Sequence, residues 1–263
     1  MGTPTAYAFV DLETTGGSAQ HDRITEIAII RVDGERVTRY QSLLNPQQHI
    51  SLFIESITGI SNAMVADAPE FADVADEVWA WLQDCVFVAH NVRFDYGFLK
   101  QAFERVGKDF QPEQLCTVKL SRRLYSEHKH HGLDQLIDRH GLRMSQRHRA
   151  LADADAIYQF WQIVHQEFAA DVLQAACLKV MNKPSLPVYL NPLSIDTLYN
   201  GYGVYLIYGD NDLPLYIGKS KTVKTRLLAH FRSDVVSGKE MALAQQARRL
   251  AIIECAGDVA ALV

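Results

Sequence analysis

The chain has 263 residues, 48% of them hydrophobic, and a formal net charge of −5, which allows one large domain or two smaller ones. Its four cysteines show no C-x-x-C spacing, so we expect neither a zinc site nor a disulfide framework. No apolar run approaches the roughly 20 residues that span a bilayer, and the N-terminus lacks a basic-then-apolar signal pattern. The composition therefore predicts a protein of the reducing cytosol with no membrane partner.

An apolar strand is predicted at residues 6–10, and two acids, Asp11 and Glu13, follow it. Side chains of a strand alternate between its faces, so both carboxylates project to the same side. Two like charges about 7 Å apart repel each other unless a cation lies between them. The pattern indicates a hard divalent metal held by oxygen ligands. Acids at the solvated end of an ordinary strand are the alternative.

A further acid, Asp95, lies near the junction between a predicted strand at 85–89 and a helical pattern at 96–106. Ligands gather at the carboxyl ends of strands in α/β folds, which favours a functional role for this acid. A helix N-terminus also stabilises an acid, so Asp95 alone fits either reading.

Basic residues dominate the segment 119–149, which has eight Lys and Arg against three acids. Such a segment can follow a phosphate backbone, and an exposed helical surface is the alternative. The same segment holds His128, His130 and His131, whose spacing does not put them on one helix face. We interpret these histidines as structural, next to a short helix predicted at 133–139.

A long helix with apolar periodicity is predicted to open at residues 148–153 and to continue to Phe168. This places His148 just before the helix and Asp153 within its first turns. Taken alone, His148 could be a surface residue. The order of His148 and Asp153 after two other acidic blocks makes coincidence a poor account.

These blocks, D-x-E-T-T-G, H-N-x-x-F-D and H-R-A-x-x-D, resemble the DEDDh exonucleases, the proofreading type found with bacterial replicative polymerases. The resemblance covers about residues 5–170 and implies an α/β, RNase H-like fold with a mixed five-stranded sheet. It implies metal-ligand roles for Asp11, Glu13, Asp95 and Asp153, and a general-base role for His148. It assigns nucleic-acid binding to Thr14, Thr15, His90, Asn91, Phe94 and Arg149.

The residue types suit this chemistry on physical grounds. Two cations, Mg²⁺ or Mn²⁺, about 4 Å apart can activate the nucleophile and neutralise the leaving oxygen of a phosphodiester. Four carboxylates can hold such a pair. Imidazole, with a reference pKa near 6.5, suits removal of a proton from water at neutral pH.

The helical pattern fades after about Lys179, and several Pro and Asn residues follow. We therefore predict a linker at 182–200 between an exonuclease domain at 1–181 and a second domain at 201–263. The second domain carries a small positive balance, with nine Lys and Arg against seven acids over residues 182–263.

Two β-rich runs, 203–208 and 215–220, flank a polar turn and predict a hairpin followed by a basic helix. Their glycine-tyrosine blocks resemble the GIY-YIG endonucleases, most closely the N-terminal nuclease domain of bacterial excinuclease C, with Val204 in place of isoleucine. The resemblance implies a small α+β domain. It assigns catalysis to Tyr205, Tyr216, Lys219 and Arg226, and we expect nucleic-acid contacts from Lys221, Lys224 and His230.

The proposed tyrosine base needs a pKa below its usual value of about 10, and we expect Lys219 and Arg226 to lower it. Core tyrosines of an ordinary hairpin are the alternative. The family also has one metal-binding glutamate in a helix after the third strand, which we predict at 249–254. The sequence ends at Val263, before such a glutamate, so we expect a fragment of a longer protein whose second centre, with its single divalent metal, is incomplete.

Together these features predict a metal-dependent 3′→5′ exonuclease on single-stranded 3′ ends of DNA, joined to an endonuclease-like module for branched or damaged DNA. It would release nucleoside 5′-monophosphates and work with polymerase or repair factors. The alternatives are an exonuclease that trims RNA 3′ ends and a non-catalytic nucleic-acid-binding adaptor.

Overall fold

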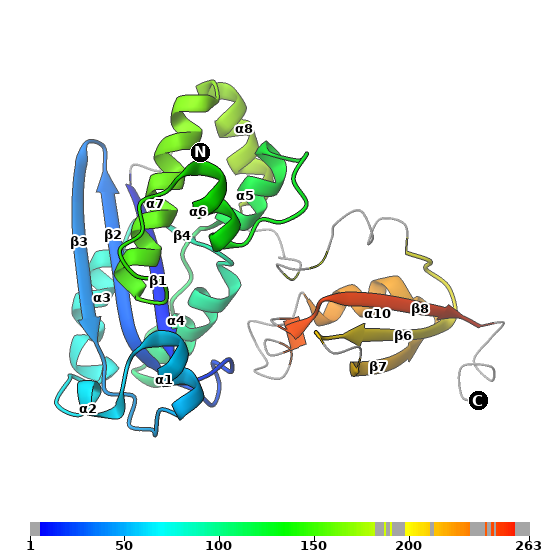
Figure 1. Ribbon diagram of the computed structural model, residues 1–263, viewed down its shortest axis with the longest axis horizontal. Coiled ribbons are helices and arrows are strands. Elements are labelled where there is room, and N and C mark those ends of the chain that lie inside the picture. The colour runs from blue at the N-terminus through cyan, green and yellow to red at the C-terminus, as the bar shows by residue number, and fades with distance from the viewer. Residues whose placement is uncertain are drawn as a thin grey trace. The chain divides into compact units, whose positions relative to one another are not determined.

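A computed structural model divides the chain into two compact units, Met1–Lys183 and Pro184–Val263, here called unit 1 and unit 2 (Figure 1). The structure describes residues 6–181, 187, 190, 198–210, 213–231, 240, 243–244 and 246–255. Most of the predicted linker at 182–200 lies outside the described residues. Leu190, from within that range, packs into the core of unit 2.

Unit 1 begins with three consecutive strands, and helices precede and follow each of the two later strands. Its strands are β1 (Ala6–Thr14), β2 (Ile24–Asp33), β3 (Arg36–Leu43), β4 (Val86–Ala89) and β5 (Gln114–Cys116). Its helices are α1 (Leu52–Thr58), α2 (Asn62–Val65), α3 (Phe71–Leu82), α4 (Arg93–Arg105), α5 (Thr117–Leu124), α6 (Leu133–His140), α7 (Ala150–Glu167) and α8 (Ala170–Val180).

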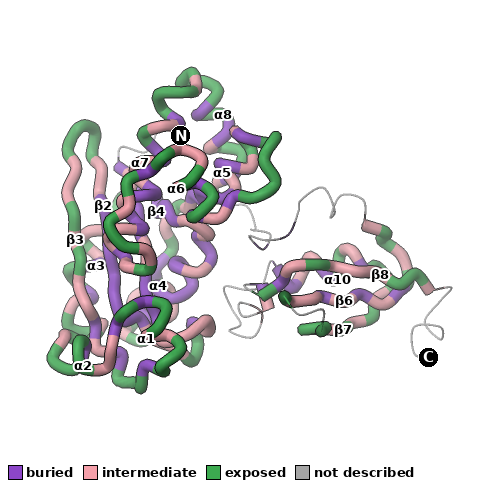
Figure 2. The backbone as a smooth tube through the Cα atoms, in the orientation of Figure 1, coloured by how far each residue is buried: buried purple, intermediate pink, exposed green. Residues whose placement is uncertain are grey.

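The five strands form one mixed sheet in the order β3-β2-β1-β4-β5, which confirms the predicted fold class. β1 pairs antiparallel with β2 and parallel with β4. Figure 2 shows that the central strands β1, β2 and β4 are largely buried, whereas the edge strand β3 is not. The centre of the sheet, where the predicted acids lie, is therefore the most protected part of unit 1.

Strand alternation divides the core of unit 1 between the two faces of the sheet. On one face, Phe9 and Ile30 pack with Phe160 and Trp161 of α7. Phe87 of β4 contributes to an aromatic cluster elsewhere, where its ring centroid lies 5.9 Å from that of Phe110. Large apolar side chains on both sides of β4 explain why this short strand is completely buried.

The first strand is longer than predicted, because it continues past Val10 to Thr14. Asp11 pairs with Ala28 and Glu13 pairs with Glu26, so both acids lie within the ladder rather than beyond it. The register breaks only between Glu13 and Thr14. The cause is the length of β2, which keeps supplying hydrogen-bond partners to the polar end of β1.

Of the three histidines before α6, His131 has the structural role that we predicted, whereas His128 and His130 are exposed. His131 is buried, its Nδ1 lies 2.8 Å from the hydroxyl of Ser121, and its Nε2 lies 3.0 Å from the carbonyl of His128. The helix that follows ends at Gly141, which adopts the left-handed conformation with φ +60°. These contacts fix the segment that leads to His148.

Unit 2 contains a three-stranded antiparallel sheet in the order β7-β6-β8, with the described helix α10 beside it. Its described elements are β6 (Gly203–Tyr208), β7 (Pro214–Ser220), α10 (Val223–His230) and β8 (Arg249–Glu254). The hairpin, the basic helix and the third strand all lie where the sequence predicts them. Tyr205, Ile207 and Leu227 form part of the core of unit 2.

Within the described part of the chain, no helix combines the length and the apolar composition needed to cross a membrane.

Candidate active sites

The face of β1 that carries Tyr7 and Phe9 packs against α7. The ring of Trp161 lies 4.9 Å from that of Tyr7 and 5.9 Å from that of Phe9, measured between centroids. Asp11 and Glu13 continue this face, because side chains two residues apart share a side of a strand. β1 thus directs both carboxylates toward the side of the sheet that α7 covers.

Asp95 reaches the same place from α4. The described pairing of β1 with β4 ends at Phe9, and further along β1 the backbone N–H of Leu12 donates to the carboxylate of Asp95. Asp95 is the third residue of α4 and is only 2% exposed. A carboxylate in the first turn of a helix is stabilised by the helix dipole. This bond holds Asp95 against the segment of β1 that carries the two acids.

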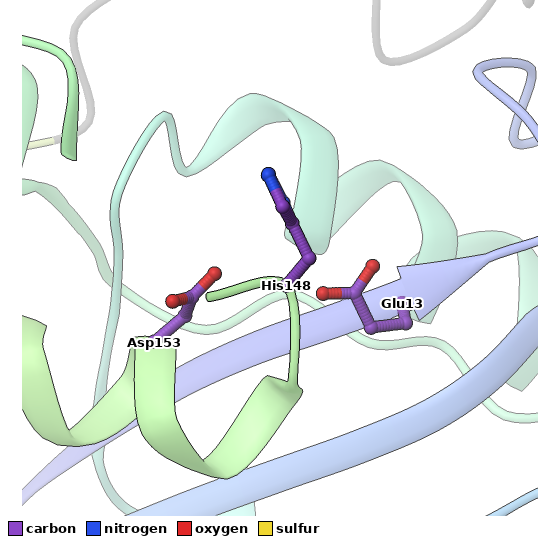
Figure 3. Close-up of side chains that lie close together, drawn as sticks. All are labelled: Glu13, His148 and Asp153. Atoms are coloured by element: carbon purple, nitrogen blue, oxygen red, sulfur yellow. The ribbon is translucent and has the colours of Figure 1, made fainter. Parts of the chain in front are cut away.

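His148 and Asp153 come from the start of α7. The carboxylate of Asp153 accepts a hydrogen bond from the backbone N–H of His148, whose φ of +56° lies in the left-handed region. Figure 3 shows Glu13, His148 and Asp153 converging from the end of β1, the preceding loop and the first turns of α7. One potential ligand atom from each lies within 4.8 Å of the others. The predicted ligands Glu13 and Asp153 and the predicted base thus lie together.

Burial raises the pKa of all four carboxyl groups in this cluster. For Asp11 the neighbouring charges of Asp95 and Asp153 add to the effect, and the pKa of Glu13 reaches about 8. Burial likewise raises the pKa of Asp95 and of Asp153, although hydrogen bonds and nearby cationic groups oppose it. Buried carboxyl groups this close together lose their protons readily only when a bound cation offsets their negative charge.

One oxygen of the cluster supports a cation in particular. Oδ1 of Asp153 is buried and has no hydrogen-bond partner among the described residues. A buried carboxylate oxygen without a partner is costly, and a divalent cation is a ligand that satisfies it. The residues present therefore fit a metal centre.

Arg147 is the principal cation of the cluster among the described residues, and sequence reasoning treated it only as one of many basic residues. Its guanidinium donates to Asp153 and, over 2.6 Å, to Asp134 of α6. It also lowers the pKa of Asp11 and Glu13 against the effect of burial. Arg147 therefore offsets part of the negative charge at the site and connects α6 to α7.

Glu26 and Arg149 form a second feature that the sequence analysis missed. Glu26 is fully buried in β2, and its carboxylate accepts from Arg149 Nε at 3.0 Å, from Arg149 Nη2 at 2.6 Å and from the backbone N–H of Ala150 at 3.0 Å. These bonds fasten the first residue of α7 to the sheet. They lower the pKa of Glu26 despite its burial. The signal in the sequence was an acid inside the otherwise apolar run of β2.

Arg149 was predicted to bind nucleic acid, and the structure instead commits its guanidinium to Glu26. The hydroxyls of the two predicted threonines also have partners within the protein. Thr14 donates to the carbonyl of Gly16 at 2.7 Å, and Thr15 contacts Gln48 at 3.1 Å. Nucleic-acid binding by these three residues stays a prediction, and their observed contacts shape the frame of the site.

The residues of the second predicted block, H-N-x-x-F-D, are also built into the frame of the site. His90 lies with its Nδ1 3.0 Å from the hydroxyl of Thr117, and burial lowers its pKa to about 3, so its ring is neutral near pH 7. Asn91 has a φ of +69° and begins the turn into α4. Phe94 is partly exposed and its ring centroid lies 4.8 Å from that of Phe98. The exposed part of Phe94 remains available to a ligand.

In unit 2 the two predicted tyrosines lie together with His230. The rings of Tyr205 and Tyr216 are stacked, with centroids 5.9 Å apart, and the ring of His230 lies 4.5 Å from that of Tyr216. The hydroxyl of Tyr205 lies 2.7 Å from Nε2 of His230. His230 is 5% exposed, so it is part of this cluster rather than a surface contact for nucleic acid as predicted.

Both glycines of the paired blocks are required by close packing. A Cβ at Gly218 would lie 2.3 Å from Cζ of Tyr205, and one at Gly203 would lie 2.4 Å from the carbonyl oxygen of Ile253. Gly218 pairs with Tyr205 across the hairpin, so its missing side chain makes the space that the ring fills.

The expected effect on the tyrosine pKa is wrong. Burial and the neighbouring Tyr216 raise the pKa of Tyr205 to about 12, and the opposing effect of Arg226 is smaller. Lys219 pairs with Val204, so strand alternation directs its side chain to the face opposite Tyr205. Desolvation of the buried phenol disfavours its ionised form, and the hydrogen bond and charge of Arg226 do not reverse this.

The remaining predicted residues of unit 2 lie at the surface or near it. Lys219, Lys221 and Arg226 are exposed, and Lys224 is partly exposed on α10. Lys221 lies over the ring of Tyr202, with Nζ 5.9 Å from the centroid. Residues 256–263, on which the expectation of an incomplete centre depends, lie outside the described residues.

Comparison with known proteins agrees with both resemblances. A family model described as Exonuclease, of the RNase T type, matches residues 8–160, and a model described as UvrC-like GIY-YIG domain matches residues 201–263. The PolC-type DNA polymerase III of Staphylococcus saprophyticus is 39% identical over 163 residues, which cover 61% of this chain. The match spans about 11% of that polymerase.

Solved structures resemble the same part of the chain. Exonuclease X, in complex with 5′ overhanging duplex DNA, has a TM-score of 0.50 and 26% identity, covering 65% of this chain and 99% of its own. A zinc-bound complex of Escherichia coli exonuclease I with single-stranded DNA has a TM-score of 0.60 and 19% identity, covering 78% and 48%. The second likeness shows the fold alone. With its DEDDh-type fold and acidic cluster, the chain belongs to the exonuclease family of nucleic-acid hydrolases and carries a UvrC-like GIY-YIG domain after it.

Proposed function

We propose that unit 1 removes nucleotides from the 3′ ends of single-stranded DNA and releases nucleoside 5′-monophosphates. The convergence of Glu13, His148 and Asp153, with potential ligand atoms within 4.8 Å, is the observation that carries this proposal. Asp11 and Asp95 interact electrostatically with the same group. Family membership accounts for hydrolysis of nucleic acid, and the polarity of digestion and the single-stranded substrate belong to the proposal.

The four carboxylates of Asp11, Glu13, Asp95 and Asp153 would hold two Mg²⁺ or Mn²⁺ ions. Bound there, the cations would neutralise charge on the phosphate and make water more acidic. The unpartnered Oδ1 of Asp153 and the raised pKa values of the acids support this assignment. Oxygen donors suit these hard cations better than softer metals.

His148 is the proposed general base. It is exposed, whereas Glu13 and Asp153 are buried, so its imidazole lies where substrate can approach. It accepts a proton from the attacking water and returns it to solvent. The hydrogen bond from its backbone N–H to Asp153 fixes the loop that carries the ring.

DNA is the favoured substrate because of the relatives. The 39% identity to a DNA polymerase III and the duplex DNA bound by exonuclease X support a role in DNA repair or processing, with polymerase or repair factors as partners. Because bacterial DNA lies in the cytosol, the cytosol is the location that this role implies.

For unit 2 we propose an endonuclease-like module that directs the exonuclease to branched or damaged DNA. Tyr205, Tyr216 and Arg226 would act on the phosphodiester, and a complete site would hold one divalent metal. The stacked tyrosines and the basic residues of α10 support this proposal.

In the decisive experiment, the purified chain is incubated with 5′-labelled single-stranded DNA or matched RNA in Mg²⁺, Mn²⁺ or EDTA. The length of the labelled strand is then measured. We expect a metal-dependent ladder that shortens from the 3′ end of DNA, and loss of the ladder in Asp11→Asn and His148→Ala. Asp67→Asn and His130→Ala, at exposed positions of unit 1, are matched controls and keep the parent rate.

Each other outcome identifies a different function. Preferential shortening of RNA would replace the DNA substrate by RNA 3′-end trimming. A gel shift without any change of length, with either metal, would support the adaptor. A ladder that persists in Asp11→Asn would show that the acidic cluster is not the active site.

A further inference from the structure

A chain of polar groups crosses the core of unit 2. The hydroxyl of Tyr205 lies 2.7 Å from Nε2 of His230, and Nδ1 of the same ring lies 3.2 Å from Oε1 of Glu240. Tyr205 is 1% exposed and His230 is 5% exposed. Three ionisable side chains in one buried line require a specific arrangement of protons, because unsatisfied buried polar groups are costly.

The chemistry of the three groups fixes that arrangement. A neutral imidazole has one N–H donor and one acceptor nitrogen, and an ionised carboxylate only accepts. Glu240 therefore requires the proton of His230 to be on Nδ1. Nε2 is then left as an acceptor, and it faces the hydroxyl of Tyr205. The second oxygen of Glu240, Oε2, is buried and has no partner among the described residues, so this carboxylate is directed into the unit.

Packing restricts the imidazole to this orientation. Its ring lies 4.5 Å from the ring of Tyr216 and 5.7 Å from that of Tyr205, between centroids. Gly218 in turn allows the ring of Tyr205 to approach β7. An imidazole held by two aromatic rings and bonded at both nitrogens has little freedom to turn.

A buried phenol acts as a base only if its own proton can leave. Burial raises the pKa of Tyr205 to about 12, so the phenol is neutral at physiological pH. The hydroxyl hydrogen-bonds with Arg226, Tyr216 and His230. Arg226 only donates and Tyr216 is itself a phenol, so Nε2 of His230 is the acceptor among them that can take the proton. Lys219, expected to assist the tyrosine, is directed to the opposite face of the hairpin.

We propose that Tyr205, His230 and Glu240 form a proton relay, in which Glu240 is a positioning residue that orients His230 to accept the phenolic proton of Tyr205. This inference rests on the proposed endonuclease-like function of unit 2. It also gives His230 a role different from nucleic-acid binding.

The proton balance of the relay is simple. A water molecule gives one proton to the oxygen of Tyr205 as the phenolic proton moves to Nε2 of His230. The water oxygen bonds to phosphorus, the bond from phosphorus to the leaving sugar oxygen breaks, and that oxygen takes a proton from solvent. The imidazolium, stabilised by the carboxylate of Glu240, returns its proton to solvent and restores the starting state.

The relay is tested first by the tautomer of His230. The full chain is labelled with ¹⁵N-histidine, and the His230 ring is assigned by the signals that disappear in His230→Gln. At about pH 8, where an unperturbed imidazole is neutral, we expect Nδ1 to carry the proton and Nε2 to have the shift of an acceptor nitrogen. Glu240→Ala should abolish this preference, and Glu240→Asp should restore it in part. Glu254→Ala, at an exposed glutamate of β8, is the matched control and leaves the signal unchanged.

Three results would overturn the relay. They are a proton on Nε2 in the parent chain, an imidazolium at this pH, or a tautomer that is the same in Glu240→Ala. The parent measurement decides the question even if Glu240→Ala does not fold.

Cleavage of branched DNA is measured separately, in an Asp11→Asn background that silences the exonuclease. We expect His230→Gln to lower kcat by about 100-fold and Glu240→Ala by about 10-fold, with KM unchanged. Absence of cleavage in the parent, together with the expected tautomer, is the result expected of an incomplete metal centre in unit 2, and it keeps the hydrogen-bonded relay. Cleavage that is insensitive to His230→Gln would remove the catalytic role of the relay.

Discussion

The two candidate sites bury polar groups by different means. In unit 1 four carboxyl groups share one place, and Arg147 offsets only part of their charge. In unit 2 a phenol, an imidazole and a carboxylate are joined in a line by hydrogen bonds, between aromatic rings. The first arrangement leaves negative charge that cations from solution can neutralise, whereas the second is linked by hydrogen bonds between side chains of the protein. We therefore expect the first site to respond strongly to charge and metal, and the second to respond to packing and hydrogen bonding.

The largest expected effect is loss of a ligand in unit 1. Asp153→Asn should reduce the rate of exonuclease cleavage by at least about 10³-fold, because a neutral amide binds a divalent cation weakly. Initial rates on labelled single-stranded DNA measure the effect. Asp155→Asn, two residues further along α7 and paired with Arg39, is the matched control and keeps the parent rate. Equal losses in both variants would point to damage of α7 rather than loss of a ligand.

The next effect concerns the bond that holds α7 to the sheet. Glu26→Ala leaves the guanidinium of Arg149 without its partner and should lower the free energy of unfolding of unit 1 by about 3 kcal/mol. All three tryptophans, Trp79, Trp81 and Trp161, lie in unit 1, so their fluorescence during urea unfolding reports on this unit. A loss below about 0.5 kcal/mol would mean that this ion pair does not stabilise the unit.

For unit 2, a change of packing should have more effect than a change of charge. Gly218→Ala places a methyl group against the ring of Tyr205 and should destabilise the unit by about 2 kcal/mol. Gly209→Ala is the control on the same hairpin, because its Cβ would meet Leu215 at an ordinary 3.4 Å. Amide hydrogen exchange of the peptides that cover β6 and β7 measures the difference. Similar exchange in the two variants would contradict the packing argument.

The smallest expected effect is a pH dependence of stability that arises from the acids of unit 1. The pKa of Glu13 is about 8 in the folded protein, above its ordinary value, so the folded state binds this proton more tightly than the unfolded state. The protonated Glu13 therefore contributes stability at low pH. This contribution falls as pH rises toward 8, by up to about 1.4 kcal/mol per pH unit. Burial lowers the pKa values of His90 and His131, which gives the opposite slope only below about pH 6.5.

The measurement is the thermal midpoint of tryptophan fluorescence in EDTA between about pH 6.5 and pH 8. The midpoint should fall with pH in the parent chain and fall less in Glu13→Gln. Mn²⁺ should reverse the trend, because metal binding requires ionised ligands. An equal slope in the two proteins would show that Glu13 does not carry the extra proton.

The sequence was sufficient to predict much of the fold and part of the first site. Alternation along β1 predicts that Asp11 and Glu13 share a face, and the start of a periodic helix predicts that His148 and Asp153 lie close together in the chain. These are local properties, so a pattern reveals them. The true end of β1 was missed because it depends on β2, which pairs with it through Glu13.

Contacts between distant residues explain the other differences. Glu26 and Arg149 are 123 residues apart, and nothing in the sequence of either segment identifies the other. Tyr205 and His230 were both singled out, yet their bond depends on how α10 packs on the hairpin. Glu240 was not among the residues predicted for this site. The burial that raises the pKa of Tyr205 is likewise a property of the folded unit, whereas the lysine and arginine nearby are visible in the sequence.

The backbone of His148 shows that the first site is not optimised for folding. Its φ of +56° is a conformation that glycine adopts freely and that costs an L-residue with a side chain about 1 kcal/mol. Glycine at this position would relieve the backbone strain, but it would also remove the imidazole. With the general-base role that we propose for His148, this conformation is a small loss of stability accepted to keep a proton acceptor beside the acids, a stability–activity trade-off located at a single residue.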